Sequence, residues 1–500
     1  MKKLHYLLPL LALPLQAATV ETRATHGVFY AGLEKQVCLQ IQVKADAADA
    51  GKKISSLTFN TGKSTKKTDI TKARLYKSSR NYFTLNTGDP DQTIKASQVG
   101  EVVATSGSGT FTNPDVTLSE GTNYLWLVYD IASNAKGNNK IDGVCSNVRI
   151  GNDDVKPVAK MGTHVKSRVY GTVYPFKYRV VPYYRTKWIL GWGAHSLTST
   201  HFKSYTDFIH FGYTLNEAGQ VLPQWDTRVD GTEESGNQNN AAALAQLKSV
   251  RGTAKCNLIA GLGFVDGGLA HFYRNCSSRE EMKTVARNIA KLLLEKGYDG
   301  VDIDWEYPGE TSGNEGQDWQ YHTYLIADLR EELAGSAKTI SIAASVGYKT
   351  PWHEVSDQLD FLNTMSYDDQ AFNHASMGLF QRDCRDICKD RLKMPKAKIV
   401  GGLPFYTNRQ WVIADQCGWN TVVSQHPNIA PSVNEAVLVL GNGSAVHSFN
   451  GANLIKEKAK WVKDNGYGGV MIWSCDNDMP LTHKMSLGKA LFSVLKQTKR

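Results

Sequence analysis

The chain has 500 residues, which is longer than a typical single domain and leaves room for two. Hydrophobic residues make up 41% of it, enough for a globular core, and the formal net charge is +9. Outside the first residues, no apolar run is long enough to cross a membrane, so the composition argues against a membrane span. We find no Gly-rich phosphate loop and no His-Glu-x-x-His motif, and we expect no metal or other cofactor.

The N-terminus has the organisation of a secretory signal peptide. Lys2 and Lys3 precede an apolar run from Leu7 to Leu15, and Gln16-Ala17-Ala18 follows. The alternative is a membrane anchor, but the run is too short to span a bilayer. We therefore assign residues 1–17 to a signal peptide. We expect a secreted monomer that is periplasmic, at the cell surface or extracellular.

The charge distribution leaves two interpretations open. Basic residues crowd the segment from Lys63 to Lys77, which could attract acidic glycans or nucleic acid. A solvated lysine-rich face explains the same residues more simply, and we expect no nucleic-acid partner.

The cysteines are even in number, which permits disulfides in an exported chain. They are Cys38, Cys145, Cys256, Cys276, Cys384, Cys388, Cys417 and Cys475. Because Cys38 and Cys145 fall within one domain, a disulfide between them is the pairing that we favour. The segment from Cys384 to Cys388 could close a loop. A zinc site there is less favoured, because no second clustered pair and no nearby His are present.

Residues 18–162 have the pattern of an all-β sandwich. Short alternating runs such as Val37–Val43 and Ile54–Phe59 are separated by turn-forming residues, and no long helical periodicity appears. At Ala73–Tyr76 and Glu120–Ile131 the segment weakly resembles the domain that precedes some bacterial sialidases. Such a domain could bind glycan or a cell surface. We favour a spacer or docking role, because the single Trp126 lies in a core-like run.

Residues 163–185 join this part to the rest of the chain. The segment is rich in tyrosine, with Tyr170, Tyr174, Tyr178, Tyr183 and Tyr184. We expect a connector that packs between the domains as a strap rather than a flexible linker.

Residues 186–500 alternate strand-like apolar runs with helical stretches, the pattern of a parallel α/β fold. Helices are expected at Asn239–Val250 and, after the capping box Ser278–Glu281, up to Lys296. Eight strands in about 300 residues predict a (β/α)8 barrel. The expected strands are Lys187–Trp192, Asp207–Tyr213, Asn257–Gly261, the acidic run within Asp299–Pro308, Thr339–Ala344, Asp360–Tyr367, Ala397–Leu403 and Gly469–Trp473.

The fourth of these strands carries three acids on one face. With a period of two, Asp302, Asp304 and Glu306 share a face and lie roughly 6–7 Å apart in succession. The apolar residues Val301, Ile303 and Trp305 occupy the other face. Acids that repel one another and lose solvation usually mark a site. At the carboxyl end of the strand, Glu306 can donate a proton, and the charge of Asp304 can raise the pKa of Glu306.

The run Asp-Gly-Val-Asp-Ile-Asp-Trp-Glu-Tyr-Pro at Asp299–Pro308 resembles the signature of glycoside hydrolase family 18, the chitinases and their relatives. The resemblance implies that the substrate's own 2-acetamido oxygen attacks the anomeric carbon. Glu306 would act as acid and then as base. Asp304 would hold the acetamide N–H, and Asp302 would share a proton with Asp304. Chitin or chitooligosaccharides would be the substrate.

Two further segments resemble the same family. Met365-Ser366-Tyr367-Asp368 matches its Met-x-Tyr-Asp, which places Tyr367 on the acetamido oxygen and Asp368 on a sugar or behind the acid. Gly469–Trp473 matches the last strand, where Trp473 would floor the subsite of the reacting sugar. A packed core role remains the alternative for Tyr367 and Trp473.

The remaining substrate-binding candidates have weaker support from the sequence. Tyr406 follows the family-like Gly402-Leu403-Pro404-Phe405, and Tyr307 and Met365 adjoin the matched motifs. Trp192 and Tyr213 are weaker candidates, since both could be core residues.

The sequence departs from the family at three places. Gly261–Phe264 stands where Ser-x-Gly-Gly is common, and Thr407-Asn408 replaces the usual Gly-Arg. Between Tyr406 and Gly468 we find no small α+β insertion of the kind that walls the cleft in some processive family members, and we therefore expect a shallow, open cleft that favours internal cleavage.

Two other functions stay open. One is an endo-β-N-acetylglucosaminidase acting on N-glycan cores, although Trp305 and the Met-Ser-Tyr-Asp segment fit chitinases better. The other is a non-catalytic glycan-binding protein, but inactive relatives typically lose the acid, and Glu306 is present.

Overall fold

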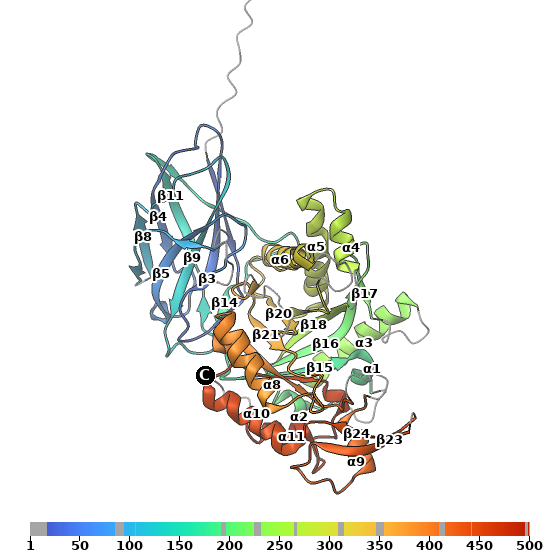
Figure 1. Cartoon of the computed structure of the whole chain (residues 1–500). Helices are drawn as coiled ribbons and strands as arrows, with labels where there is room; N and C mark the ends of the chain where they lie inside the picture. Colours follow the sequence, from blue (N-terminus) through green and yellow to red (C-terminus); the bar gives the residue numbers. More distant parts are fainter. Residues whose placement is uncertain are drawn as a thin grey trace, which may run out of the picture.

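The computed structural model describes residues 18–85, 95–105, 107–191, 197–224, 232–264, 268–308, 315–346, 355–409, 416–441, 443–495 and 499. It has a β-rich N-terminal part beside a larger barrel (Figure 1). The expected signal peptide and Trp192 lie outside the described residues. No helix within them combines the length and the apolar character needed to cross a bilayer.

The N-terminal part is built around two main sheets that share one core, and a smaller three-stranded sheet lies beside them. One sheet contains β1 (Thr19–Ala24), β3 (Gln36–Ala45), β9 (Gly121–Ile131) and β5 (Ile70–Ser78). The other contains β12 (Asp153–Val155), β11 (Val144–Ile150), β4 (Ile54–Asn60) and β8 (Ser108–Thr112). Side chains of both sheets, such as Ile41 and Phe59, are fully buried in a common cluster. This is the all-β sandwich that the alternating runs predict.

The second part confirms the predicted (β/α)8 barrel. In the described residues eight parallel strands form one sheet, and it closes because the first strand pairs with both the second and the last. In order they are β15 (Arg179–Arg185), β16 (Asp207–Leu215), β18 (Asn257–Phe264), β19 (Gly300–Trp305), β20 (Thr339–Ala344), β21 (Phe361–Thr364), β22 (Ile399–Pro404) and β25 (Gly469–Trp473). Its larger helices are α3 (Glu233–Arg251), α5 (Arg279–Lys296), α6 (Glu315–Glu332) and α10 (Ala452–Asn465).

The first barrel strand is not where the sequence analysis expected it. Lys187–Trp192 was the expected strand, but helix α1 (Thr186–Ile189) begins there. The strand is β15, which lies within the segment expected to be a connector. All of β15 except Arg185 is buried, as is typical of a parallel strand covered on both faces. Tyr183 and Tyr184 therefore belong to a barrel strand and not to a strap between the domains.

The acidic strand β19 has the predicted alternation. Val301, Ile303 and Trp305 pack in the large core between the strands and the helices. Asp302 and Asp304 are buried on the opposite, inward side. The predicted cap of the preceding helix α5 is also present, because the Ser278 side chain accepts a hydrogen bond from the Glu281 N–H at 3.2 Å.

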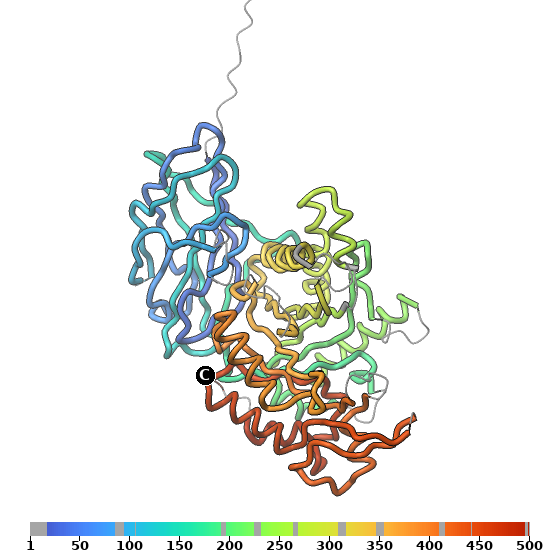
Figure 2. Tube along the Cα trace, in the orientation of Figure 1, coloured from blue at the N-terminus to red at the C-terminus, as the bar shows by residue number. Residues whose placement is uncertain are grey.

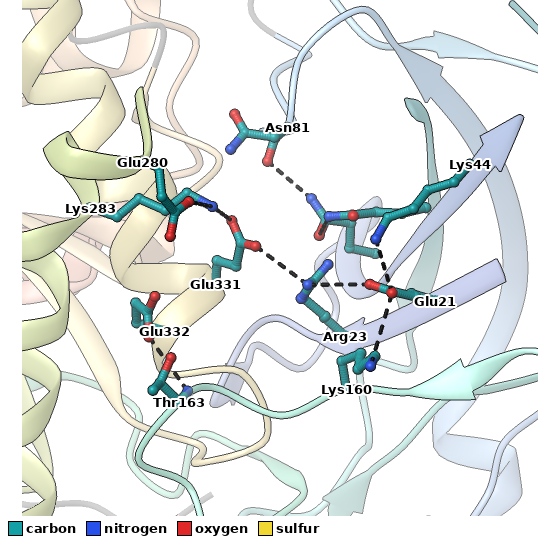
Figure 3. Close-up of polar contacts among 12 residues, drawn as sticks. Glu21, Arg23, Lys44, Asn81, Lys160, Thr163, Glu280, Lys283, Glu331 and Glu332 are labelled. Atoms are coloured by element: carbon teal, nitrogen blue, oxygen red, sulfur yellow. Dashed lines mark hydrogen bonds and ion pairs between the residues drawn. The ribbon is translucent and has the colours of Figure 1, made fainter. Parts of the chain in front are cut away.

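The sandwich packs directly on the barrel through charged side chains (Figure 3). Arg23 of β1 lies 3.4 Å from Glu331 of α6, and Lys283 of α5 lies 3.0 Å from the same carboxylate. The Thr163 N–H donates to Glu332 at 3.4 Å. Because Arg23, Lys283 and Glu331 remain partly exposed, each of the two ion pairs contributes little to stability on its own.

A buried contact joins the two parts at the amino ends of the barrel strands. The Tyr30 hydroxyl donates to the Asp360 carbonyl at 2.6 Å and accepts from Arg179 at 2.9 Å. Arg179 also donates to Asp207 at 2.6 Å, and its guanidinium lies 3.8 Å from the centre of the Tyr174 ring. All of these side chains are buried, so this end of the barrel is closed by a residue of the sandwich.

The chain trace passes once from the sandwich into the barrel and ends near the junction (Figure 2). There Lys499 forms a β-bridge with Phe176, which lies between the sandwich and β15.

The cysteines do not form the expected disulfide. All eight lie in described residues and are free thiols. Cys38 and Cys145 come from opposite sheets of the sandwich and are buried as small apolar side chains, and the Cys145 thiol points to the Asn147 carbonyl at 3.8 Å. Cys384 and Cys388 lie in a continuous π-helix, η3 (Arg382–Arg391), and not in a loop. Among the described residues no cluster of side chains suits a metal.

Candidate active site

A pocket of about 400 Å³ opens at the carboxyl ends of the barrel strands, the end at which such barrels carry their sites. Most of the predicted site residues meet there. The pocket is lined by Tyr183, Asp304, Glu306, Tyr307, Ala343, Ser345, Met365, Tyr367, Asp368, Asp369, Gln370, Leu379, Arg382, Asp383, Met471 and Trp473.

Asp302 lies beneath the pocket and is fully hydrogen-bonded. Its carboxylate accepts from Ser341 and Tyr183 at 2.5 Å each and from the Asn363 amide at 3.0 Å. Burial raises the pKa of Asp302 to about 6, and the three hydrogen bonds keep it from rising further. The donors come from β20, β15 and β21, so three strands hold this one side chain.

Asp304 is the next inward acid and has a different environment. It is 5% exposed, and its Oδ1 atom has no hydrogen-bond partner among the described residues. Burial, followed by the charges of Glu306 and Asp302, raises the pKa of Asp304 well above its usual range. A buried carboxyl with an unoccupied oxygen is suited to accept a proton or an N–H group.

Glu306 follows β19 and is half-buried at the wall of the pocket, with Tyr307 beside it. It stands one pleat above Asp304, roughly 6–7 Å away by strand geometry. From this position the Glu306 carboxyl can reach a ligand in the pocket, and it interacts electrostatically with Asp304.

Aromatic residues form the floor of the pocket. The Trp473 ring meets Tyr183 and Phe211 edge-on, with centroid distances of 5.4 and 5.2 Å. Burial and then the charge of Asp304 raise the pKa of Tyr367 well above its usual range, so its hydroxyl remains a hydrogen-bond donor. Because Tyr183 and Phe211 support the Trp473 ring, its face suits the apolar face of a sugar ring.

Asp368 is held in position by a second set of contacts. It adopts a left-handed backbone with φ of 60°, and its carboxylate accepts from Tyr406 and Asn408 at 2.6 Å each. Burial raises the pKa of Asp368, but these bonds and the nearby His374 outweigh burial and lower it. Tyr406 is therefore placed behind Asp368 and not on the pocket wall. Asn408, which replaces the family's usual residue, supports the same carboxylate.

Tyr213 is not at the site, although the sequence analysis named it as a weak candidate. The pairing of β16 with β18 shifts between Phe211 and Tyr213, so one extra residue bulges at Gly212. The bulge turns Tyr213 outward, where its hydroxyl lies 3.0 Å from that of Tyr298 in the outer core.

The departure at the third strand has a steric explanation. At Gly261, where the resembled pattern has Ser, a Cβ atom would lie 2.8 Å from the Ile209 side chain. Gly263, which matches the pattern, is confined in the same way, because its Cβ would lie 2.3 Å from the Phe211 ring. Glycines here leave room for the large side chains of β16 inside the barrel.

A small α+β element that the sequence did not predict lies between Tyr406 and Gly468, but it is not of the kind that walls the pocket. Helix α9 (Trp419–Gln425) and the hairpin of β23 (Glu435–Leu440) and β24 (Gly443–Ser448) lie between β22 and α10. The alternating valines of β23 were the signal that the sequence analysis missed. No described residue of this insertion lines the pocket, and the hairpin projects from the barrel (Figure 1).

Several residues that support or line the pocket were not predicted from the sequence. Tyr183 was assigned to the connector, although it ends an inward row on β15. Ser341 and Asn363 are polar residues inside apolar strands, which is a usable signal. Arg382 and Asp383 line the pocket from η3, and no motif pointed to them.

We expect Tyr183→Phe to move the acidic limb of the pH–activity profile upward. The Tyr183 hydroxyl stabilises ionised Asp302, so its removal raises the pKa of Asp302 above about 6. A hydrogen bond to a charged group is worth about 1.5–3 kcal/mol, which corresponds to a shift of about one to two pH units. The profile of kcat/KM against pH measures the shift. Tyr213→Phe removes a buried hydroxyl from the outer face of β16, away from Asp302. It should therefore leave the acidic limb of the profile unchanged. Equal profiles for both variants would contradict the coupling.

The chain is similar to known proteins in both of its parts. Residues 192–478 match the model of glycosyl hydrolases family 18, and residues 19–154 match the N-terminal domain of BNR-repeat neuraminidase. The chain is 22% identical to an endochitinase of Manduca sexta over 60% of its own length, and 24% identical to chitotriosidase-1 of Mus musculus over 48%. It spans 64% and 62% of those proteins, less than two thirds of either.

Two solved structures share the fold. A chitinase from Bacteroides thetaiotaomicron superposes with a TM-score of 0.51 at 19% identity, over 64% of this chain and 96% of that one. Chitinase ChiW from Paenibacillus sp. str. FPU-7 gives a TM-score of 0.52 at 16% identity, over 97% of this chain and 57% of that one. The family model covers more than half of the sequence and includes every barrel strand from β16 onward. The chain therefore belongs to glycosyl hydrolase family 18.

Proposed function

We propose that this protein is a secreted chitinase-type hydrolase that cleaves β-1,4-linked N-acetylglucosamine chains by substrate-assisted, retaining catalysis. Family membership supports the hydrolase class, and the chitinases among its relatives support the substrate. The pocket supports the mechanism, because Glu306, a carboxyl that can donate a proton, lines it together with Asp304, a buried acid with an unoccupied oxygen.

The contrast between Asp302 and Asp304 carries the proposal. Asp302 has three donors, so it can serve as a fixed charge below the site. Asp304 has a buried Oδ1 without a partner among the described residues. The N–H of a 2-acetamido group is the donor that this oxygen lacks, and a sugar without the group would leave it unsatisfied.

The first chemical step then breaks the glycosidic bond. Glu306 gives its proton to the glycosidic oxygen while the acetamido carbonyl oxygen bonds to the anomeric carbon. The positive charge of the resulting oxazolinium ion lies beside Asp304, which stabilises it. In the second step Glu306 takes a proton from water, the water oxygen bonds to the anomeric carbon, and the ring opens back to the acetamide. Two inversions give net retention.

The remaining residues hold the sugar for this step. Tyr367 donates its hydroxyl to the acetamido oxygen, and Trp473 supports the ring of the reacting sugar. Asp368, kept ionised by its neighbours, accepts from a sugar hydroxyl. Met365 and Tyr307 complete the wall.

The proposal also includes export of the protein from the cytoplasm. The basic and apolar start of the sequence supports cleavage near Ala17 and action outside the cytoplasm. The sandwich packs on the end of the barrel opposite the pocket, which supports a docking or spacing role for it.

Product analysis on labelled chitohexaose tests the function. We expect shorter oligomers that initially retain the β-anomer, and no cleavage of the fully de-N-acetylated hexamer, which lacks the internal nucleophile. A high-mannose glycopeptide distinguishes action on N-glycan cores. Hydrolysis of the de-N-acetylated hexamer at a similar rate would refute the mechanism, and cleavage of the glycopeptide alone would refute the substrate.

A further inference from the structure

The π-helix η3 (Arg382–Arg391) begins at the wall of the pocket. Its first two residues line the pocket, whereas Cys384, Ile387 and Cys388 are buried in the core. Helices of this type are rare and are frequently found at functional sites. The proposed reaction uses neither Arg382 nor Asp383.

Arg382 is held by a buried carboxylate. Its Nε and Nη2 atoms donate to the same Asp383 oxygen at 3.0 and 2.9 Å. The Asp383 side chain is 4% exposed and that of Arg382 is 48% exposed. Burial raises the pKa of Asp383, while Arg382 and Ser366 act in the opposite direction. The guanidinium therefore has a fixed orientation. Within the described part of the chain no hydrogen bond or ion pair is found for Nη1.

The same helix offers an internal comparison. Arg385 pairs with Asp386, and Lys389 with Asp390, in the same one-residue spacing. Both pairs are about half exposed, as is usual for ion pairs of little energetic value. Of the three paired carboxylates, only that of Asp383, at the pocket, is buried. Burying it contributes little to stability, and its effect is to orient the arginine.

Arg382 is the single cationic side chain among the described residues that line the pocket, and several acids line the rest. A guanidinium presents N–H donors in a fixed fork and has no acceptor. The carbonyl oxygen of an acetamido group is a matching acceptor. The reacting sugar uses its own acetamido oxygen on the anomeric carbon, so the acceptor belongs to the neighbouring sugar.

We propose that Arg382, oriented by Asp383, forms a subsite for the N-acetylglucosamine unit next to the reacting one and donates a hydrogen bond to its acetamido carbonyl oxygen. This subsite rests on the proposed function, because it assumes a chain of N-acetylated sugars in the pocket. It makes Arg382 a specificity residue for N-acetylated neighbours.

Binding to an inactive background tests the subsite separately from catalysis. In Glu306→Gln protein we would measure the dissociation constants of chitohexaose and of its fully de-N-acetylated counterpart by calorimetry. Adding Arg382→Gln should weaken chitohexaose binding about 10- to 100-fold, the loss of one hydrogen bond from a charged donor. It should not weaken binding of the de-N-acetylated hexamer. Asp383→Asn should weaken chitohexaose binding to a smaller extent.

Arg385→Gln is the matched control, since it removes an arginine with the same pairing outside the pocket. Thermal midpoints near that of the parent would show that the variants fold. If Arg382→Gln and Arg385→Gln bind chitohexaose equally well, the subsite is refuted. If Arg382→Gln weakens both hexamers equally, the acetamido contact is refuted. Failure of the parent protein to hydrolyse chitohexaose would refute the proposed function and leave this binding result to stand on its own.

Discussion

Glu306→Gln should lower kcat on chitohexaose by about 10³-fold or more while the dissociation constant for the oligomer stays within a few-fold of the parent value. The amide has nearly the shape of the acid but cannot donate a proton to the glycosidic oxygen. General acid–base catalysis contributes about 10²–10⁴-fold, and here one group serves in both steps. Initial rates and calorimetric binding measure the two quantities.

Glu217→Gln provides the control, because Glu217 is mostly exposed and lies outside the pocket lining. Its activity should match that of the parent. Retained turnover in Glu306→Gln would remove this residue as the proton donor. Loss of binding together with turnover would instead indicate that the variant disturbs the pocket, and the thermal midpoint would show whether folding is affected.

The stack of acids on β19 could be predicted because it depends on one strand alone. Period-two alternation decides which side chains share a face, and the structure places Asp302 and Asp304 inward as expected. What distinguishes the two acids depends on other strands. The donors to Asp302 come from β15, β20 and β21, and their meeting is a consequence of barrel closure.

The errors have similar physical origins. A run of tyrosines is compatible with a strap or with a buried strand, and only the pairing of β15 with β25 decides between them. The position of Tyr213 depends on one bulged residue, Gly212. An isolated glycine inside a strand suggests such a bulge, but it does not show how the following side chains turn. The two thiols in the sandwich fit an apolar core as well as a disulfide would, and cysteine spacing cannot separate the two.

The end of the barrel opposite the pocket shows how much the sandwich contributes. Arg179 contacts Asp207 and Tyr174 within the barrel and Tyr30 from the sandwich, and it is fully buried. Asp360, whose carbonyl accepts from Tyr30, directly precedes β21. The sandwich and barrel should therefore unfold in one cooperative transition rather than two.

Arg179→Met should destabilise the protein by about 3–5 kcal/mol, because it leaves Asp207 charged and buried without its cation. Urea unfolding followed by tryptophan fluorescence would show a lower midpoint. Arg23→Met removes the partly exposed pair with Glu331 and should cost less than about 1 kcal/mol.

A second substitution separates lost packing from lost charge. In the Arg179→Met background, Asp207→Asn removes the unpaired charge and keeps a polar group for the donors that remain, Tyr174 and Thr206 among them. Part of the lost stability should return, because a neutral amide can be buried more cheaply than a lone carboxylate. If Asp207→Asn made the variant less stable still, the loss would come from packing and not from charge. If Arg179→Met and Arg23→Met shifted the midpoint equally, the closed end of the barrel would not depend on this ion pair. The positions of β15 and β16, which carry Tyr183 and Phe211 toward the pocket, would then have to be maintained by the strand pairing alone.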